Sequence, residues 1–338
     1  MSKNKVIIPI FIPHKGCRFD CIFCNQRSIS GQTKNVTMKD VRDIIDAHLR
    51  TIKNDIIPEV AFYGGSFTGI EIKEQTNFLE CVYEYIKEGK ISSIRLSTRP
   101  DYINIDVLEN LKKYNVSTIE LGVQSLNDDV LRLSHRGHTA WDVKNAVKLI
   151  KDYGFKLGIQ TMIGLLGDTK DISLDTARKV IEYKPDCVRI YPTMVIKGTY
   201  LSKLFECGEY NPLTLEEAVD ICVDLCKLYY KNGINVIRVG LQPTDNITNG
   251  GDVLAGPFHP AFRQIVDSRL FREKIENEIL RNNLKDEVHI YVNDKFLSLA
   301  IGQKRCNINY FIKKFNLKRV KVHGVRDERD DFLRVNGL

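Results

Sequence analysis

Residues 6–24 read VIIPIFIPHKGCRFDCIFC, an apolar run that leads directly into three closely spaced cysteines. Val6–Pro13 has the composition of a buried strand, and Cys17, Cys21 and Cys24 lie on the loop that would follow it. The chain has nine cysteines, an odd number that cannot all form disulfides, and six of them are scattered. Three thiols within eight residues therefore indicate a metal site rather than cross-linking.

Strand-like and helix-like segments alternate outward from this stretch. The expected strands cover residues 6–13, 60–63, 91–97, 116–123, 156–163 and 187–191. Helices are expected near residues 38–52, 73–87, 105–114, 140–153 and 173–183, with a long helix near 214–232. This alternation predicts a parallel sheet with right-handed crossovers, and six consecutive βα units suggest an open or full barrel.

A second region begins where glycine and proline accumulate, in residues 241–260. We expect a first domain of residues 1–240, followed in residues 241–338 by a linker loop and a smaller α/β module. In the module we expect a helix near 261–281, strands near 288–292 and 296–301, a helix near 307–315 and a strand near 319–322.

Positive charge is concentrated in this last region. The 338-residue chain has a net charge of +7, and residues 261–338 contain 17 Lys and Arg against 11 Asp and Glu. A basic lobe suggests a polyanionic partner, although a solvated basic surface fits the charge equally well.

Composition excludes several classes of protein. With 43% hydrophobic and 28% charged residues, the chain is not mainly disordered, collagen-like or coiled coil. No apolar run approaches the ~20 residues of a membrane helix, and the first residues lack a secretory signal. We therefore expect a cytoplasmic protein without a membrane partner.

The three clustered thiols allow more than one metal. Three thiolates from one loop can bind three irons of a 4Fe–4S cubane, which leaves the remaining iron free to bind a small molecule. A structural zinc site would need a fourth ligand, for which His14 is the only nearby candidate. Three unrelated free thiols are the remaining interpretation.

The cysteine spacing, with Phe23 immediately before Cys24, resembles the signature of the radical S-adenosylmethionine (SAM) enzymes. The resemblance implies a partial (β/α)6 barrel of the TIM type and a 4Fe–4S cluster held by Cys17, Cys21 and Cys24. It implies SAM chelated to the unique iron through its methionyl amine and carboxylate, and reductive cleavage to a 5′-deoxyadenosyl radical that abstracts hydrogen from substrate. A reductant such as flavodoxin or ferredoxin would supply the electron.

Segments at other expected strand ends resemble SAM-binding elements of the same superfamily. Gly64-Gly65 resembles the glycine pair beside the methionyl amine. The segment Thr98-Arg99-Pro100 is similar to one in the Elongator catalytic-subunit family, whose members often carry Glu where Ser97 stands. By resemblance, Gln124 would contact the ribose, Arg136 the methionyl carboxylate, and residues 160–167 the adenine. The expected cofactor contacts are Phe23, Gly64, Gly65, Ser97, Arg99, Gln124, Arg136, Gln160 and Met162. Taken singly, such residues also occur in plain turns, on polar surfaces and at buried strand ends.

Two residues are candidates for the catalytic step itself. Tyr191 ends the sixth expected strand, and barrels place their chemistry at such ends. It is a candidate substrate contact or hydrogen donor, with a buried structural tyrosine as the alternative. Cys306 lies within the basic segment and is a candidate radical quencher.

Segments from Ile12 to Phe262 are similar to the Elongator catalytic-subunit-like radical SAM proteins, and the last module resembles the region that accompanies their barrel. The family implies transfer of an acetyl-CoA-derived group to a tRNA wobble uridine. Its full-length members continue into an acetyltransferase domain, and we expect this chain to end before one. Either a separate acyl-transfer partner supplies that step or the substrate differs.

Residues 302–321 contain seven cations and no acidic residue. Cationic side chains beside aromatic ones suit RNA phosphates and unstacked bases, although the helical spacing of Tyr310, Phe311 and Phe315 favours a core position for them. We predict tRNA as the partner, bound by Lys304, Arg305, Lys313, Lys314, Lys318, Arg319 and Lys321. Three other functions stay open: radical chemistry on a small or porphyrin-like substrate, a non-catalytic binder like the heme chaperones, and an RNA-binding protein with structural zinc.

Overall fold

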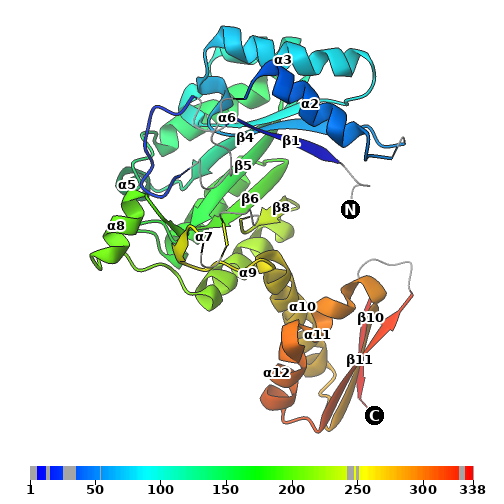
Figure 1. Ribbon diagram of the computed structural model, residues 1–338. Helices are drawn as coiled ribbons and strands as arrows, with labels where there is room; N and C mark the ends of the chain where they lie inside the picture. Colours follow the sequence, from blue (N-terminus) through cyan, green and yellow to red (C-terminus); the bar gives the residue numbers. More distant parts are fainter. Residues whose placement is uncertain are drawn as a thin grey trace. The chain divides into compact units, whose positions relative to one another are not determined.

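The computed structural model of the protein describes residues 6–12, 16–25, 36–53, 55–241, 247–248, 251–326 and 332–337. The chain folds into two compact units (Figure 1). The first comprises Met1–Ala218 and Leu228–Pro260, and the second comprises Val219–Lys227 and Ala261–Leu338. The stretch 241–260 thus belongs to the first unit by its contacts.

A parallel sheet of seven strands forms the first unit, in the order β1-β2-β3-β4-β5-β6-β8. Its strands are β1 (Ile7–Ile12), β2 (Glu59–Gly64), β3 (Ile94–Thr98), β4 (Val116–Gln124), β5 (Lys156–Ile163), β6 (Cys187–Pro192) and β8 (Asn235–Val239). The predicted alternation and the parallel sheet of a partial α/β barrel are confirmed. Strand β8 was not predicted, because five residues with two exposed positions carry little strand signal directly behind a long helix.

Helices connect these strands along the chain. They are α2 (Met38–Leu49), α3 (Ile72–Lys87), α4 (Ile105–Lys113), α5 (Asp128–Leu133), α6 (Ala140–Asp152), α7 (Lys170–Glu182), α8 (Tyr200–Glu206) and α9 (Leu215–Lys231), with the short 3-10 turns η1 (Phe67–Gly69) and η2 (Pro100–Tyr102). Capping boxes built on Thr37, Thr139 and Thr214 fix where α2, α6 and α9 begin. No helix in the described ranges is both long and apolar enough to cross a membrane.

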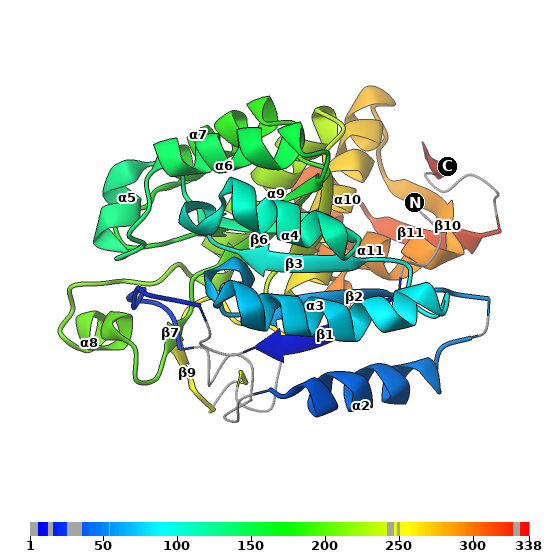
Figure 2. The ribbon, with the colours of Figure 1, turned by 90° about the horizontal axis from the view of Figure 1, so that it is seen from above.

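At one end of the sheet, the segments that connect strands to helices contain short helices and strands of their own. Figure 2 shows α5, α8, β7 (Val195–Ile196) and β9 (Val253–Ala255) gathered at this end. Strands β7 and β9 pair antiparallel there. This is the end to which the carboxyl termini of the parallel strands point.

The second unit is a three-stranded sheet covered by helices. Strand β10 (Glu287–Asn293) lies between β11 (Arg319–Val325), which is parallel to it, and β12 (Leu333–Gly337), which is antiparallel. Helices α10 (Phe262–Arg281), α11 (Leu297–Ile301) and α12 (Cys306–Phe315) accompany the sheet, with the turns η3 (Asp294–Phe296) and η4 (Gln303–Arg305). Its core includes Ile275, Val288, Ile290, Phe311 and Val320.

One prediction in this unit is wrong. Residues 296–301 were expected to form a strand, but Leu297–Ile301 form helix α11. Leu297, Ala300 and Ile301 recur at helical spacing and pack on the core of the unit, so a helix buries the same apolar run. The expected core position of Phe311 is confirmed, and Tyr310 and Phe315 pack against the same core.

Candidate active site

The expected site residues of the first unit lie at one edge of its sheet. Parallel strands present their carboxyl ends together, and the cysteine loop follows β1 at that edge. The residues at or directly after the other strand ends are Gly64, Gly65, Ser97, Arg99, Gln124, Met162 and Tyr191. The fold therefore brings together segments that are far apart in sequence.

The cysteine loop is fixed at its start by a close backbone approach. Gly16 has φ +76°, and a Cβ there would overlap the carbonyl oxygen of Ser66, so only glycine fits. Next to it, Cys17 Sγ lies 3.6 Å from Ser66 Oγ. The Arg18 amide donates to the Tyr102 hydroxyl at 3.0 Å. These contacts hold the start of the loop against the ends of β2 and β3.

Apolar packing and two backbone hydrogen bonds fix the end of the loop. The Ile22 amide donates to the carbonyl of Ser134 at 3.2 Å, and the Leu201 amide donates to the carbonyl of Ile22 at 2.8 Å. Phe23 is buried in a cluster against which Met162 packs. The structure thus brings these two predicted cofactor contacts together. The other buried members of the cluster are Cys21, Ile22, Val130, Leu165, Val195, Leu201 and Tyr210.

The three thiols of the loop differ in their surroundings. Cys17 is exposed, Cys21 is buried and Cys24 is half-buried, and none of them is in a disulfide. As the side chains stand, no three His, Cys, Asp or Glu residues in the described part of the chain converge as metal ligands. The three cysteines share one anchored loop, and their assignment as cluster ligands stays a prediction. His14, the fourth ligand considered for zinc, lies outside the described residues.

Arg136 joins the cysteine loop to β4. Its Nη1 donates to Cys21 Sγ at 3.2 Å, and its Nη2 donates to the carbonyl oxygen of Gly122 at 2.5 Å. Its Nε is buried and has no partner. Arg99 donates to the carbonyl of Arg136 and is held by Asp101 at 3.0 and 3.1 Å. Two guanidinium groups therefore lie beside the loop, with that of Arg99 also 4.7 Å over the ring of Phe19.

Gln124 has an unusual backbone at the end of β4. Its φ is +68°, although it is not glycine, and the register of β4 with β5 shifts between Gly122 and Gln124. Its buried Oε1 has no hydrogen-bond partner. Strained residues with unpaired buried polar atoms are typical of ligand sites. Gln124 Oε1 and Arg136 Nε thus leave one acceptor and one donor unsatisfied at this edge.

His138 follows Arg136 and is also buried. Its Nε2 lies 3.3 Å from the carbonyl oxygen of Val123, while its Nδ1 has no partner. Burial, followed by the charges of Arg136 and Arg99, lowers the pKa of His138 to about 2. The ring is therefore neutral, and it adds no positive charge beside the two arginines.

A buried ionic network inside the barrel was missed by the sequence analysis. Glu120 accepts hydrogen bonds from Arg95 at 2.9 Å, from Arg189 at 2.6 and 3.1 Å, and from Tyr63 at 3.2 Å. Burial alone would raise the pKa of Glu120, but Arg189 and Arg95 outweigh it and the pKa is lowered. In the sequence, a charged residue in the middle of an otherwise apolar strand could have indicated such a network.

Two of the expected site residues border this network. Gln160 donates to Glu120 Oε2 at 3.1 Å, so its amide is already engaged within the protein. Tyr191 lies close enough to Arg189 and Glu120 for both to act on it, and burial is the main reason that its pKa is raised. Its phenol is therefore protonated at neutral pH.

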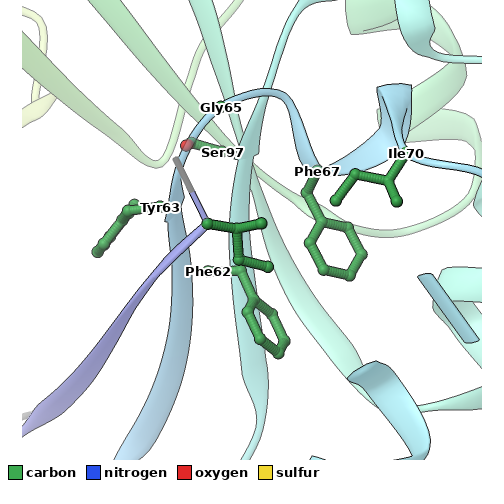
Figure 3. Close-up of a pocket in the computed structure, with 7 residues that line it drawn as sticks. Phe62, Tyr63, Gly65, Phe67, Ile70 and Ser97 are labelled. Atoms are coloured by element: carbon green, nitrogen blue, oxygen red, sulfur yellow. The ribbon is translucent and has the colours of Figure 1, made fainter. Parts of the chain in front are cut away.

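Ser97 and Gly65 meet at a small hollow between the ends of β2 and β3 (Figure 3). Its other lining residues are Ile12, Phe62, Tyr63, Phe67 and Ile70. The Gly65 amide donates to the carbonyl of Ile12 at 2.9 Å, which holds the glycine pair against β1. The walls are mostly apolar, and Ser97 and Tyr63 are the lining residues with a hydroxyl group.

The remaining expected residues belong to the second unit. Cys306 is exposed at the first position of α12. Three of the seven expected RNA-binding cations are already in ion pairs: Lys314 with Glu276, Lys318 with Asp286 and Lys321 with Glu287. Lys304, Arg305, Lys313 and Arg319 are exposed.

Comparison with known proteins decides the family. The model of the radical SAM superfamily matches residues 11–180, half of the chain. The chain belongs to the radical SAM superfamily. The model of the Radical_SAM C-terminal domain matches residues 185–272. The cofactors of the superfamily, and so of this protein, are a 4Fe–4S cluster and SAM.

Curated relatives point to one branch of the superfamily. The chain is 31% identical over 183 residues to the tRNA uridine(34) acetyltransferase of Methanocaldococcus jannaschii. The matched segment covers 48% of this chain and 34% of that protein. It is 30% identical over 231 residues to the enzyme of the same name from Dehalococcoides mccartyi, covering 62% and 50%. Human Elongator complex protein 3 is 32% identical over 155 residues, covering 44% and 28%. The chain thus spans no more than half the length of these relatives.

A solved structure supports the fold. The archaeal Elp3 of Methanocaldococcus infernus with an N-terminal deletion superposes with a TM-score of 0.61 over 80% of this chain and 63% of that one, at 22% identity. The predicted resemblance to the radical SAM and Elongator-type proteins is confirmed.

The residues at the strand ends fit the two cofactors by their chemistry. Three cysteines on one anchored loop supply the thiolates that an iron–sulfur cluster requires. An unpaired amide oxygen and an unpaired guanidinium N–H beside them match the hydroxyl and carboxylate groups of SAM.

Proposed function

We propose that this radical SAM protein is a cytoplasmic enzyme that cleaves SAM reductively and acts on tRNA at the wobble uridine. The observation that carries the proposal is the meeting of the cysteine loop with Arg136 and Gln124, whose buried Nε and Oε1 lack partners. The proposal of the wobble uridine as the target rests on the relatives, two of which are named tRNA uridine(34) acetyltransferase.

In this proposal Cys17, Cys21 and Cys24 hold the cluster and leave one iron for the amine and carboxylate of SAM. When bound, the two cofactors would supply radical chemistry: with one electron from the reductant, SAM would be cleaved to methionine and a 5′-deoxyadenosyl radical able to abstract hydrogen from the substrate. Arg136 keeps its contact to Cys21 Sγ and turns its remaining N–H groups to the methionyl carboxylate. Gln124 Oε1 accepts a hydrogen bond from a ribose hydroxyl.

The other predicted contacts complete the SAM site. Gly64 has φ +106°, and with Gly65 it presents backbone without side chains at the end of β2, which suits the methionyl amine. Arg99 supports Arg136 through its carbonyl, and Ser97 lies beside Gly65. The adenine is assigned to the segment that contains Gln160 and Met162, with Phe23 behind it.

Tyr191 and Cys306 are the proposed groups for the substrate step. The phenol of Tyr191 is protonated at neutral pH, as that of tyrosine ordinarily is, and burial raises its pKa further, so its O–H is a candidate hydrogen donor. Cys306 is exposed and can quench a substrate radical. The seven basic residues of the second unit are the proposed tRNA contacts, a flavodoxin or ferredoxin the proposed reductant, and a separate acyl-transfer protein a proposed partner.

The test is anaerobic reconstitution with SAM, a reductant and bulk tRNA, with 5′-deoxyadenosine as the readout. We expect 5′-deoxyadenosine to form and tRNA to increase it. Cys21→Ala should abolish it, because a cluster with two protein ligands is labile. Cys207→Ala is the matched control, since Cys207 is exposed and lies outside the loop. Wild-type protein that forms no 5′-deoxyadenosine, or a Cys21→Ala variant as active as the control, contradicts the proposal.

A further inference from the structure

The turn between α11 and α12 in the second unit combines exposure, positive charge and an unusual backbone. It consists of Gly302, Gln303, Lys304 and Arg305, of which the last three are exposed. Lys304 and Arg305 both have positive φ, 50° and 63°, a region that residues other than glycine rarely adopt. The turn thus holds two cationic side chains on backbone that suits glycine.

The core of the unit fixes this turn. Gly302 has φ +73°, and a Cβ there would lie 2.5 Å from Cys306 Sγ, so a side chain does not fit. Asn307 is buried, and its Nδ2 donates to Ser268 Oγ at 3.0 Å and to the carbonyl of Leu299 at 2.9 Å. These bonds tie the start of α12 to α10 and to α11. The start of α12, directly after the turn, is therefore tied to the core of the unit.

The charges of the turn are not neutralised by neighbours. Lys314, Lys318 and Lys321 are ion-paired, whereas Lys304 and Arg305 have no acidic partner in the described ranges of the chain. Arg272 adds a third cation near the start of α12. It lies 4.1 Å over the ring of Tyr310, and its buried Nε has no partner. Lys304 and Arg305 are therefore the cations of this turn without an acidic partner in the described ranges, whereas the charge of Arg272 lies within reach of Glu276.

The surrounding topology matches a known way of binding RNA. The order is strand, helix, turn, helix, strand, with β10 and β11 parallel, and Figure 1 shows α10, α11 and α12 on one side of β10 and β11. RNA-binding modules of the KH type use a Gly-x-x-Gly loop to clamp about four backbone nucleotides. Gly302 and Arg305 stand at the first and last positions of such a loop, and Arg305 has a φ that glycine would adopt.

We propose that the turn Gly302–Arg305 clamps the sugar–phosphate backbone of single-stranded RNA, with Lys304 and Arg305 against the phosphates. A four-residue turn suits a single strand, because proteins that read duplex RNA by shape contact about 16 base pairs. The identity of the RNA as tRNA rests on the proposed function, but the binding itself requires no radical chemistry.

The test measures binding of a fluorescein-labelled single-stranded RNA of about 12 nucleotides to the full-length chain, over a range of salt concentrations. The variant is Lys304→Glu with Arg305→Glu. The matched control is Arg281→Glu with Lys285→Glu, the same change of charge on exposed residues of the same unit. Ser268 is hydrogen-bonded to Asn307, which lies two residues after the turn. Arg281 lies 13 residues further along α10 than Ser268, about 20 Å along the helix axis, so Arg281 is distant from that contact. Circular dichroism establishes that both variants are folded.

We expect the turn variant to bind at least ~10-fold more weakly, and its slope of log affinity against log salt to fall by about 1.4, because two single-strand phosphate contacts are lost. The control should bind like the wild type. A duplex of the same sequence should bind more weakly than the single strand. Equal binding by the turn variant and the control, or stronger binding of the duplex, overturns the inference. Formation of 5′-deoxyadenosine without RNA is measured separately, and its absence in the wild type counts against the proposed function alone.

Discussion

The backbone of Gln124 is strained, because its φ is +68°. Glycine at this position would relieve the strain, so the fold itself does not require glutamine there. A residue with a Cβ in the left-handed region costs about 1–2 kcal/mol, of which the extra chain entropy of glycine offsets about 0.5–1 kcal/mol. An unpaired Oε1 at the same residue indicates that the side chain is kept for a ligand. The proposed contact of Gln124 with SAM would account for both the strain and the unpaired acceptor.

Gln124→Gly should therefore separate stability from binding. We expect its free energy of unfolding to equal or exceed that of the wild type by up to about 1 kcal/mol. We expect SAM affinity to fall roughly 2- to 10-fold through loss of one hydrogen bond. Urea unfolding and calorimetric titration of SAM onto the reconstituted protein measure the two effects. Gln124→Ala, which keeps the Cβ, should be the less stable of the two variants, and the reverse order would contradict the strain.

His138 makes stability depend on pH. Its pKa is lowered from 6.5 to about 2 in the folded protein, so the unfolded chain binds the proton first as the pH falls. The contribution of His138 is therefore fully present above pH 6.5 and declines below it, by about 1.4 kcal/mol per pH unit. His138→Gln should show a correspondingly shallower loss of stability between pH 6.5 and 5 in urea unfolding. Equal slopes in the two proteins would mean that His138 is not buried as a neutral ring.

Among the elements, the residues at the ends of the strands could be predicted from the sequence better than the contacts that these residues make. Gly64-Gly65 and the cysteine loop follow apolar runs, and such runs place them at the carboxyl edge without knowledge of the packing. The contact of Arg136 with Cys21 could not be predicted, because it spans 115 residues and depends on how α5 meets the loop. The helix at Leu297–Ile301 was mistaken for a strand, since a short apolar run fits either element.

The charged network inside the barrel joins β3, β4 and β6. Glu120 is 1% exposed. Its carboxylate is the ion-pair partner of Arg189, and it shares Arg95 with Glu59, which lies 2.7 Å from Arg95 Nε. Removing one partner of a buried ion pair costs about 3–5 kcal/mol, because the other charge stays buried. We expect Glu120→Gln to lose stability of that order in thermal or urea unfolding. Glu109→Gln, on the exposed side of α4, should change stability little, and equal effects of the two substitutions would show that the network is not buried as described.

At the scale of the whole molecule, the sequence indicated the basic character of the second unit but not its geometry. Counting charges in residues 302–321 treats all seven cations alike. The structure separates Lys314, Lys318 and Lys321, which are ion-paired, from Lys304 and Arg305 on the turn. Whether one of these three lysines is ion-paired depends on an acidic residue that lies 30 or more residues away in sequence. The acidic residues are Glu276, Asp286 and Glu287. Only the folded chain brings these acids to the cations.

The proposed function depends on a cluster that three cysteines hold with one iron open to SAM. The most direct measurement is the iron content of the anaerobically reconstituted protein, together with its electron paramagnetic resonance spectrum in the reduced state with and without SAM. We expect about four irons per chain, a spectrum that changes when SAM is added, and loss of both in Cys21→Ala. A colourless protein with a single zinc per chain, or an iron–sulfur spectrum that SAM leaves unchanged, would contradict it.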